Sequence, residues 1–280
     1  MKYLVTGAGQ IGSQLTHDLV DAGHDVVVLR RRQVDVGGVQ VLGGDVLDRD
    51  LLATAMDGVD AVFHCIHTAY DAKQWEQVLP TRELAVMDAA ADAGVPVVFP
   101  ESVYGFGEQS VDLSEGAEPA PISPLGEVRA RLLKARKEHR ARTISVVASD
   151  LWGPTAAPKT SVAHLSVLVP RPQNKRGFAM GNPTMPHTLT FIPDLTRAMA
   201  YAADHASEVA PEGDAILHAP SQDTGSLEDF NRTVSGRVGV RHKKLVRIPR
   251  ALLAATGRIN PMMAELRNQA YLWDLSLIHI

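Results

Sequence analysis

The 280-residue sequence contains a single cysteine, Cys65. One cysteine cannot form an intramolecular disulfide, and no grouping of cysteine and histidine has the spacing of a structural zinc site. We therefore predict no metal site. This scarcity of cysteine fits a reducing compartment, so a cytoplasmic location is expected.

The sequence also lacks a strong excess of charge and long apolar runs. It has 28 basic and 32 acidic residues, and a net charge of -4 gives no global attraction to nucleic acid or anionic lipid. No run of about 18 apolar residues occurs. The N-terminal segment MKYLVTGAGQIG begins a strand pattern at once, without the features of a signal peptide. We expect no nucleic-acid partner, no membrane span and no export.

The remaining composition is that of an ordinary globular protein, with 45% hydrophobic and 21% charged residues. In the first half, apolar runs alternate with amphipathic segments, which is typical of repeated βαβ units. The predicted strands are Lys2–Thr6, Asp25–Leu29, Val39–Leu42, Ala61–His64, Val97–Phe99 and Ile144–Ala148. The predicted helices are Ile11–Ala22, Arg49–Met56, Trp75–Ala93 and Leu125–Arg142. This pattern predicts an α/β fold with a doubly wound parallel sheet.

A GxGxxG motif joins the first predicted strand to the first predicted helix. Its first glycine permits a tight turn, its second lets the backbone approach a pyrophosphate, and its third lets the helix pack on the strand. We therefore predict a dinucleotide site of the Rossmann type; a purely structural turn is the alternative. The predicted phosphate-binding residues are Gly7, Gly9, Gln10, Ile11 and Gly12.

Arginines follow the second predicted strand, where NAD-selective sites usually carry an acidic residue. A carboxylate would repel a 2′-phosphate, whereas a guanidinium group can bind it with two hydrogen bonds. Arg30 and Arg31 therefore favour NADP(H) over NAD(H). The alternative is a solvated, arginine-rich turn.

The character of the sequence changes after Asp150, where proline and glycine become frequent. We expect residues 1–150 to form the dinucleotide-binding domain, with residues 188–220 returning to it. Residues 151–280 are expected to form mainly a smaller substrate-binding lobe, with helices at Leu227–Arg237 and Ala251–Trp273. Residues 275–280 read as a truncation or a scar, and they are left out of the functional argument.

Eight segments in this order resemble the extended short-chain dehydrogenase/reductase superfamily, in its NAD-dependent epimerase/dehydratase branch: TGAGQIG, LRRR, GGDVLD, AVFHC, VYG, SPLGEVR, SDLWGP and TFIPD. The resemblance covers roughly residues 1–220. It implies a nicotinamide dinucleotide on a Rossmann sheet and a carbonyl, hydroxyl or sugar-nucleotide substrate. It further implies Asp45 and Val46 near the adenine and Cys65 on the nicotinamide side. A homodimer is common in this superfamily.

The resemblance weakens at the family's proton relay. The family places a Ser or Thr four residues before the Tyr of VYG, and a Tyr and a Lys at the start of the next helix. The matching residues here are Pro100, Leu125 and Arg129. Leucine cannot transfer a proton, and Arg129 could hold a ribose but is a poor acid or base. We therefore predict that the usual relay is absent.

Tyr104 is the best candidate for a substitute proton donor, because it follows the fifth strand at the end where ligands bind in open α/β sheets. Ser102 and Glu101 are weaker candidates, because both could equally be turn residues. A tyrosine that only packs beneath the loop is equally open for Tyr104. Two hypotheses remain. One is an NADP(H)-dependent oxidoreductase or epimerase-like enzyme. The other is an NADP(H)-binding, redox-sensing regulator without catalysis.

Overall fold

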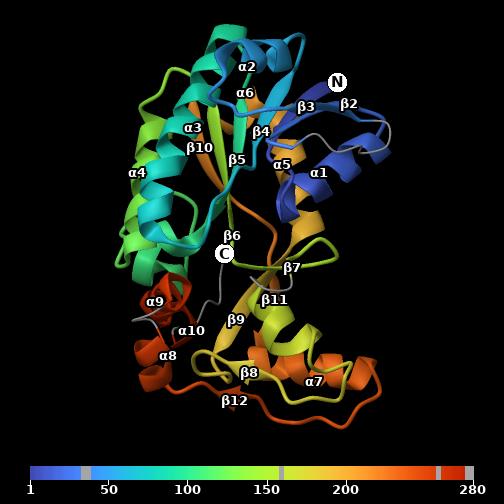
Figure 1. The fold of residues 1–280 in the computed structure, drawn as a ribbon, viewed down its shortest axis with the longest axis vertical. Coiled ribbons are helices and arrows are strands. Elements are labelled where there is room, and N and C mark those ends of the chain that lie inside the picture. Colours follow the sequence, from blue (N-terminus) through green and yellow to red (C-terminus); the bar gives the residue numbers. More distant parts are fainter. Residues whose placement is uncertain (33–38, 158–160, 257–259, 275–280) are drawn as a thin grey trace.

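A parallel sheet of seven strands forms the centre of the protein (Figure 1). It belongs to a computed structural model that describes residues 1–32, 39–157, 161–256 and 260–274. The strand order is β10-β6-β5-β4-β1-β2-β3. The strands are β1 (Lys2–Thr6), β2 (Asp25–Arg30), β3 (Gln40–Gly43), β4 (Ala61–His64), β5 (Val97–Ser102), β6 (Thr143–Ala148) and β10 (Asp214–His218).

Helices cover both faces of this sheet (Figure 1). Successive residues of a strand point to opposite faces, so Tyr3 and Val5 of β1 pack on one side and Leu4 on the other. The first side is covered by α1 (Gln10–Asp21) and α5 (Ile192–Asp204), and the second by α2 (Arg49–Met56), α3 (Ala72–Ala93) and α4 (Pro124–Lys137). The predicted doubly wound sheet of the Rossmann type is confirmed.

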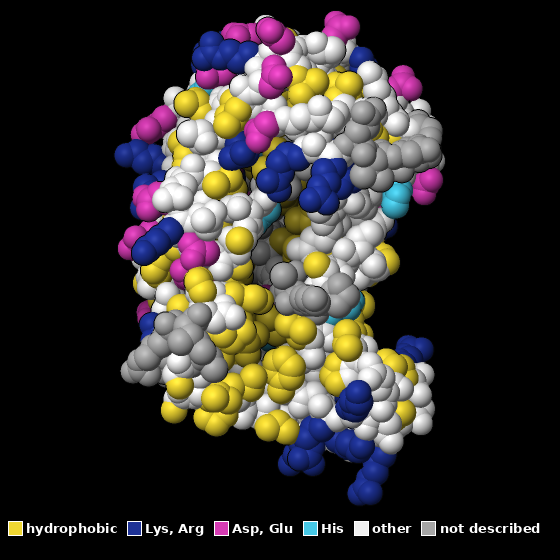
Figure 2. All heavy atoms as spheres, in the orientation of Figure 1, with side chains coloured by type: hydrophobic (Ala, Val, Ile, Leu, Met, Phe, Trp, Pro, Cys, Tyr) yellow, Lys and Arg dark blue, Asp and Glu magenta, His cyan; other side chains and the backbone are white. Residues whose placement is uncertain are grey.

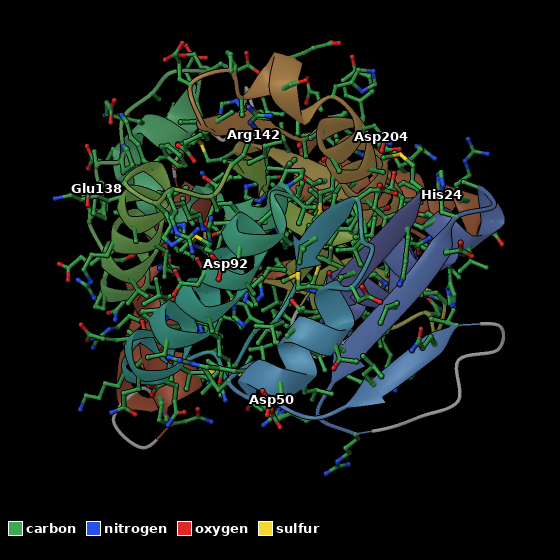
Figure 3. All side chains as sticks on the ribbon, turned by 90° about the horizontal axis from the view of Figure 1, so that it is seen from above. His24, Asp50, Asp92, Glu138, Arg142 and Asp204 are labelled. Atoms are coloured by element: carbon green, nitrogen blue, oxygen red, sulfur yellow. The ribbon has the colours of Figure 1, made fainter. Side chains whose placement is uncertain are left out.

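The strand order reverses between β1 and β4, where Thr6 lies beside His64. Ligands bind at such a switch point, at the carboxyl ends of the strands. Figure 3 looks onto the opposite edge of the sheet, where His24 and Arg142 precede β2 and β6. The carboxyl ends face the lower lobe (Figure 1).

The lower lobe is built from short elements that come before and after α5 in the sequence. Its strands are β7 (Asp150–Trp152), β8 (Phe178–Ala179), β9 (Pro186–Phe191), β11 (Gln222–Ser226) and β12 (Val246–Arg247). Its helices are a π-helical turn (His164–Leu168), α7 (Leu227–Arg237), α8 (Arg250–Thr256), α9 (Pro261–Asn268) and α10 (Tyr271–Asp274). Two short helices outside this lobe, a 3-10 helix (Val103–Val111) and α6 (Ala206–Val209), complete the described elements.

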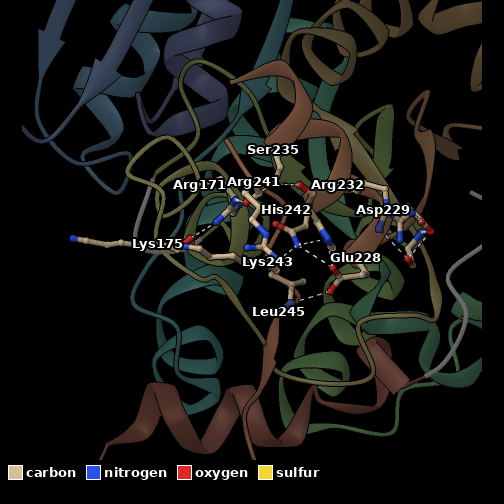
Figure 4. A network of polar contacts seen from close by, with 12 residues as sticks. Arg171, Lys175, Glu228, Asp229, Arg232, Ser235, Arg241, His242, Lys243 and Leu245 are labelled. Carbon is tan, nitrogen blue, oxygen red and sulfur yellow. Dashed lines mark hydrogen bonds and ion pairs between the residues drawn. The ribbon is translucent and has the colours of Figure 1, made fainter. Parts of the chain in front are cut away.

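Buried polar contacts hold the lower lobe together (Figure 4). The fully buried Arg171 donates hydrogen bonds to the Ser235 hydroxyl and to the main-chain carbonyls of Lys175 and Arg241. Glu228 accepts a hydrogen bond from the Leu245 N–H. Because these contacts join α7 to the segments before and after it, they fix loops that have little regular structure of their own.

Several predicted boundaries were wrong, on the central sheet and in the lower lobe. The helix expected over Leu125–Arg142 ends at Lys137, because the following residues turn into β6. The helix expected over Ala251–Trp273 is divided into α8, α9 and α10, with Asn260 and Pro261 starting α9 as its cap and first residue. Strands β7, β8 and β9 were not predicted. Residues 275–280, read above as a scar, lie outside the described residues.

Candidate active site at the switch point of the sheet

The glycine turn between β1 and α1 is closely packed at two positions and open at the third. Gly7 has a φ of 86°, and a Cβ there would lie 2.9 Å from the Ile66 nitrogen. A Cβ on Gly12 would lie 2.0 Å from the Gly7 carbonyl oxygen, whereas a Cβ on Gly9 meets nothing within 4 Å. The open space above Gly9, at the N-terminus of α1, fits the pyrophosphate of a dinucleotide.

Basic residues lie at the end of β2. Arg30 is half-buried and Arg31 is exposed, and neither forms an ion pair with an acidic side chain in the described ranges. Figure 2 shows Lys and Arg side chains gathered at the upper rim of the central hollow. Both arginines therefore leave their guanidinium groups available to an anion.

Asp45 and Val46 follow β3, but their side chains differ in environment. Asp45 binds Arg82, with Oδ2 and Nη2 2.8 Å apart. Although burial opposes ionisation, the hydrogen bonds from Arg82 and from the Leu47 N–H keep the pKa of Asp45 below its usual value. The Val46 side chain is buried in the core, so only its main chain could reach a ligand.

A cavity of about 460 Å³ extends from this turn along the carboxyl ends of β4, β5 and β6. Gly9, Gln10 and Ile11 line one end, and Cys65 lies along its wall. Burial raises the pKa of the Cys65 thiol to about 12, so this cysteine is not a ready nucleophile at neutral pH. Tyr104, Ser102 and Arg129 line the same cavity, which therefore contains residues of both predicted sites.

Arg129 is held by three neighbours at the wall of the cavity. Its Nη2 lies 2.8 Å from His67 Nε2, and its Nε lies 3.4 Å from a Glu101 carboxylate oxygen. Its guanidinium carbon lies 4.6 Å from the centre of the Trp75 ring. Burial of the His67 imidazole and the charge of Arg129 lower the pKa of His67 to about 4. His67 is therefore neutral at pH 7.

A buried ion-pair network continues from Arg129 into the protein. Glu101 also accepts a hydrogen bond from Arg136 at 2.9 Å, and Arg136 binds Glu83 through two hydrogen bonds of 2.8 Å. The Ser145 hydroxyl accepts a further hydrogen bond from Arg136. The two glutamates raise the pKa of Arg136 against the effect of burial. The network fixes Glu101 and, through it, Arg129.

Tyr104 is half-buried at the start of the 3-10 helix. Its hydroxyl oxygen accepts a hydrogen bond from the Tyr70 hydroxyl at 3.0 Å, and its ring stacks on Trp75. Burial, aided by the negative charge of Asp150, raises its pKa, so Tyr104 stays protonated at neutral pH. Ser102 directs its main-chain N–H to Glu101 at 2.7 Å, and its hydroxyl is more distant from that carboxylate at 3.4 Å.

The three positions that are predicted from the sequence to match the family's relay differ in their surroundings. Pro100 lines the cavity, as does Arg129. Leu125 is fully buried in a cluster with Trp75, Leu79 and other apolar residues of α3 and α4. A side chain at position 125 therefore points into the packing between two helices.

One group at the site was not predicted from the sequence. Asp150, at the start of β7, lines the cavity and accepts hydrogen bonds from His187 Nε2 at 2.8 Å and Trp273 Nε1 at 3.1 Å. An acid two residues after the end of the sixth strand was the available signal. His187 and Trp273 come from distant segments, so no spacing in the sequence could have joined them to it.

The order of the strands, the glycine turn and the position of the cavity define a dinucleotide-binding fold of the Rossmann type. The sequence model of the NAD dependent epimerase/dehydratase family matches residues 3–216. The chain belongs to this family.

Two relatives of known activity match part of the chain. A UDP-glucose 4-epimerase from Streptomyces lividans is 30% identical over 142 residues, which are 45% of this chain and 43% of the relative. A 2-alkyl-3-oxoalkanoate reductase from Stenotrophomonas maltophilia is 28% identical over 172 residues, which are 55% and 52% of the two chains. The chain thus matches about half the length of these relatives.

A solved structure resembles the chain over nearly its whole length. The UDP-glucuronic acid 4-epimerase from Bacillus cereus, in complex with NAD, has a TM-score of 0.71 and 18% identity and covers 98% of each chain. At this identity the likeness establishes the fold.

Among the described residues, no group of three or more His, Cys, Asp or Glu side chains is arranged to hold a metal ion. None of the described helices is both long and apolar enough to span a membrane.

Proposed function

We propose that this chain is a nicotinamide-dinucleotide-dependent oxidoreductase that prefers NADP(H) and acts on a carbonyl or hydroxyl group of a small molecule. The observation that carries the proposal is the single cavity that joins the open space above Gly9 to Tyr104 and Arg129. Such continuity lets one end bind a dinucleotide while the other holds a substrate beside it. The epimerase and the reductase among the relatives support redox chemistry.

The cofactor site that we propose uses residues at the carboxyl ends of β1, β2, β3 and β4. Gly7, Gly9, Gln10, Ile11 and Gly12 would bind the phosphates, and Arg30 and Arg31 the 2′-phosphate. The main chain at Asp45 and Val46 would border the adenine, and Cys65 the nicotinamide side. We also propose that the described residues between 151 and 274 cover the cavity as a substrate lobe, apart from the returning segment 188–220.

The chemistry we propose does not use the family's tyrosine and lysine. A bound nicotinamide supplies or accepts the hydride. Tyr104, which stays protonated, would donate a hydrogen bond to a substrate carbonyl oxygen, and Arg129 would stabilise the charge that develops there. Ser102, at the same edge, would be a second donor.

One observation favours a second candidate, a cofactor-binding regulator without catalysis. Leu125 is fully buried between α3 and α4, and Arg129 is bound by Glu101 and His67. Neither residue can transfer a proton at neutral pH. If Tyr104 does not replace them, the cavity would still bind NADP(H) and report the redox state.

Turnover with a panel of aldehydes, ketones, alcohols and sugar nucleotides separates the two candidates, with nicotinamide absorbance as the readout. We expect at least one substrate, and we expect Tyr104→Phe to lower kcat by about a hundredfold. Tyr201→Phe is the matched control, because Tyr201 is exposed on α5 and stacks on His205. NADPH binding without turnover across the panel would favour the regulator instead.

A further inference from the structure

One carboxylate oxygen of Asp150 is fixed by two hydrogen bonds. The hydrogen bonds from His187 and Trp273 both end on Oδ2. Within the described ranges, no hydrogen-bond partner of Oδ1 is found, and 19% of the Asp150 side chain is exposed. Since Asp150 lines the cavity, its free oxygen is available to whatever binds there.

The carboxylate of Asp150 is held in its ionised form. Burial alone would raise its pKa, but the hydrogen bond and the charge of His187, together with the hydrogen bond from Trp273, outweigh this effect and leave the pKa below its ordinary value. The group therefore carries a negative charge at neutral pH.

The charge of His187 acts on Asp150 from outside the lining, and no positive charge among the described lining residues balances that carboxylate. The other charged residues of the lining are Arg129, Arg136, Glu83 and Glu101. They form ion pairs with one another, so two positive charges cancel two negative ones. Burial and nearby arginines lower the pKa of His64 to about 3 and that of His67 to about 4, so both are neutral at pH 7.

The rest of the substrate end offers apolar and aromatic surface. Tyr70, Trp75 and Tyr104 contact one another edge-on or by stacking, and Leu151 and Leu272 also line the cavity. Figure 2 shows hydrophobic side chains around the lower part of the hollow. This surface suits a ligand with an apolar body.

We propose that Asp150 sets the substrate class: it admits small alcohols or ketones that are uncharged or carry an ammonium group, and it excludes anionic compounds, including sugar nucleotides. This proposal rests on the proposed function, because it places the substrate at the Tyr104 end of the cavity. A fixed carboxylate in a desolvated cavity attracts hydrogen-bond donors and cations and repels phosphate and carboxylate groups.

The charge of the cavity can be measured without knowing the substrate, because Cys65 is the only cysteine and lies in the cavity wall. Two methanethiosulfonates of similar size, one with a trimethylammonium group and one with a sulfonate, would be reacted with the thiol at about pH 9, because its raised pKa leaves little thiolate at neutral pH. Each rate is divided by the rate with free mercaptoethanol. We expect this normalised rate to favour the cationic reagent by about tenfold. Equal normalised rates, or a faster sulfonate, overturn the proposal.

Asp150→Asn assigns the effect to Asp150, because it removes the charge and keeps an oxygen for His187 and Trp273. We expect the preference for the cationic reagent to fall to about twofold or less. Asp92→Asn is the matched control, since Asp92 is exposed and pairs with Arg140 at the opposite edge of the sheet, and it should keep the wild-type preference. An unchanged preference in Asp150→Asn overturns the assignment. If that variant does not fold, the wild-type rates still decide.

A substrate-side test uses 2-phenylethanol, 2-phenylethylamine, phenylacetate and UDP-glucose as probes, with calorimetry on protein saturated with NADP⁺. We expect the alcohol and the amine to bind at least about tenfold more tightly than either anion. Tighter binding of UDP-glucose or phenylacetate contradicts the proposal. NADPH titration of the same samples distinguishes failure of the proposed function from failure of the role of Asp150. If NADPH does not bind, the proposed function is wrong. If NADPH binds normally but the anions bind more tightly, only the role of Asp150 is wrong.

Discussion

Glu101 is the acidic residue that pairs with both buried arginines beside the cavity. It binds Arg136 through one carboxylate oxygen and lies 3.4 Å from Arg129 through the other. Glu101→Gln would leave two buried arginines with one glutamate, which costs about 3–5 kcal/mol of the unfolding free energy. Urea unfolding measures the loss.

The control for this prediction is Glu76→Gln. Glu76 forms an ion pair with Arg131 on the surface, where both side chains are more than half exposed. Such a pair contributes about 1 kcal/mol at most. Equal losses in the two variants would mean that the buried network adds nothing beyond a surface pair.

His64 makes the stability of the protein depend on pH. Burial and the charge of Arg136 lower its pKa to about 3, against 6.5 in the unfolded chain, and its Nε2 has no hydrogen-bond partner among the described residues. Between these pH values the unfolded chain binds a proton that the folded chain does not. Stability is therefore lost as the pH falls, by about 2 kcal/mol from this group between pH 6.5 and 5.

His64→Gln tests this contribution, because the variant cannot take up the proton in the unfolded state. Urea unfolding at a series of pH values should show a shallower loss of stability in the variant than in the wild type. Parallel curves for the two proteins would show that His64 is protonated in the folded state as well.

Leu125, the predicted match to the family's tyrosine, lies where a tyrosine would not fit. Its side chain is fully buried against Trp75, Leu79, Val128 and Leu132. Leu125→Tyr would overpack this cluster, and we expect a loss of about 1–3 kcal/mol of unfolding free energy and no gain in turnover. A variant of unchanged stability and higher kcat would show that position 125 faces the cavity.

At the level of elements, substitutions at two glycines of the β1–α1 turn should distinguish cofactor binding from stability. Gly9→Ala places its Cβ in open space at a φ of -83°, so stability should change by no more than about 1 kcal/mol while NADPH binding weakens. Gly12→Ala brings a Cβ within 2.0 Å of the Gly7 carbonyl oxygen and should destabilise the fold itself. Thermal unfolding and NADPH titration measure both effects. If Gly9→Ala bound NADPH as the wild type does, no pyrophosphate would lie there.

How accurately an element could be predicted from the sequence depended on its length and on the residues that mark its ends. The helices Arg49–Met56 and Leu227–Arg237 and the strand Ala61–His64 were predicted with their observed bounds, because capping residues or turn residues mark their ends. Strands β7 and β8 have three and two residues, which is too short for periodicity to detect. Pairing with distant partners, rather than local preference, forms them.

At the scale of the whole molecule, the predictable part is the sheet and the glycine turn, since both follow from local patterns. The network of Glu83, Glu101, Arg129 and Arg136 was not predictable, because it joins residues from α3, β5 and α4 that are separated by up to 53 positions. The contact of Asp150 with His187 and Trp273 depends in the same way on the folded lower lobe. Contacts between residues of different helices and strands could be identified only from the three-dimensional structure.

The central claim is that the cavity binds a nicotinamide dinucleotide with the end of β2 selecting NADP(H). Titration of the purified protein with NADPH and NADH, followed by nicotinamide fluorescence, tests it most directly, together with the double variant Arg30→Ala, Arg31→Ala. We expect NADPH to bind the wild type about tenfold or more tightly than NADH, and the double variant to lose that preference while it still binds NADH. Equal binding of the two dinucleotides by the wild type would reduce the arginines to solvated turn residues, and binding of neither would contradict the claim itself.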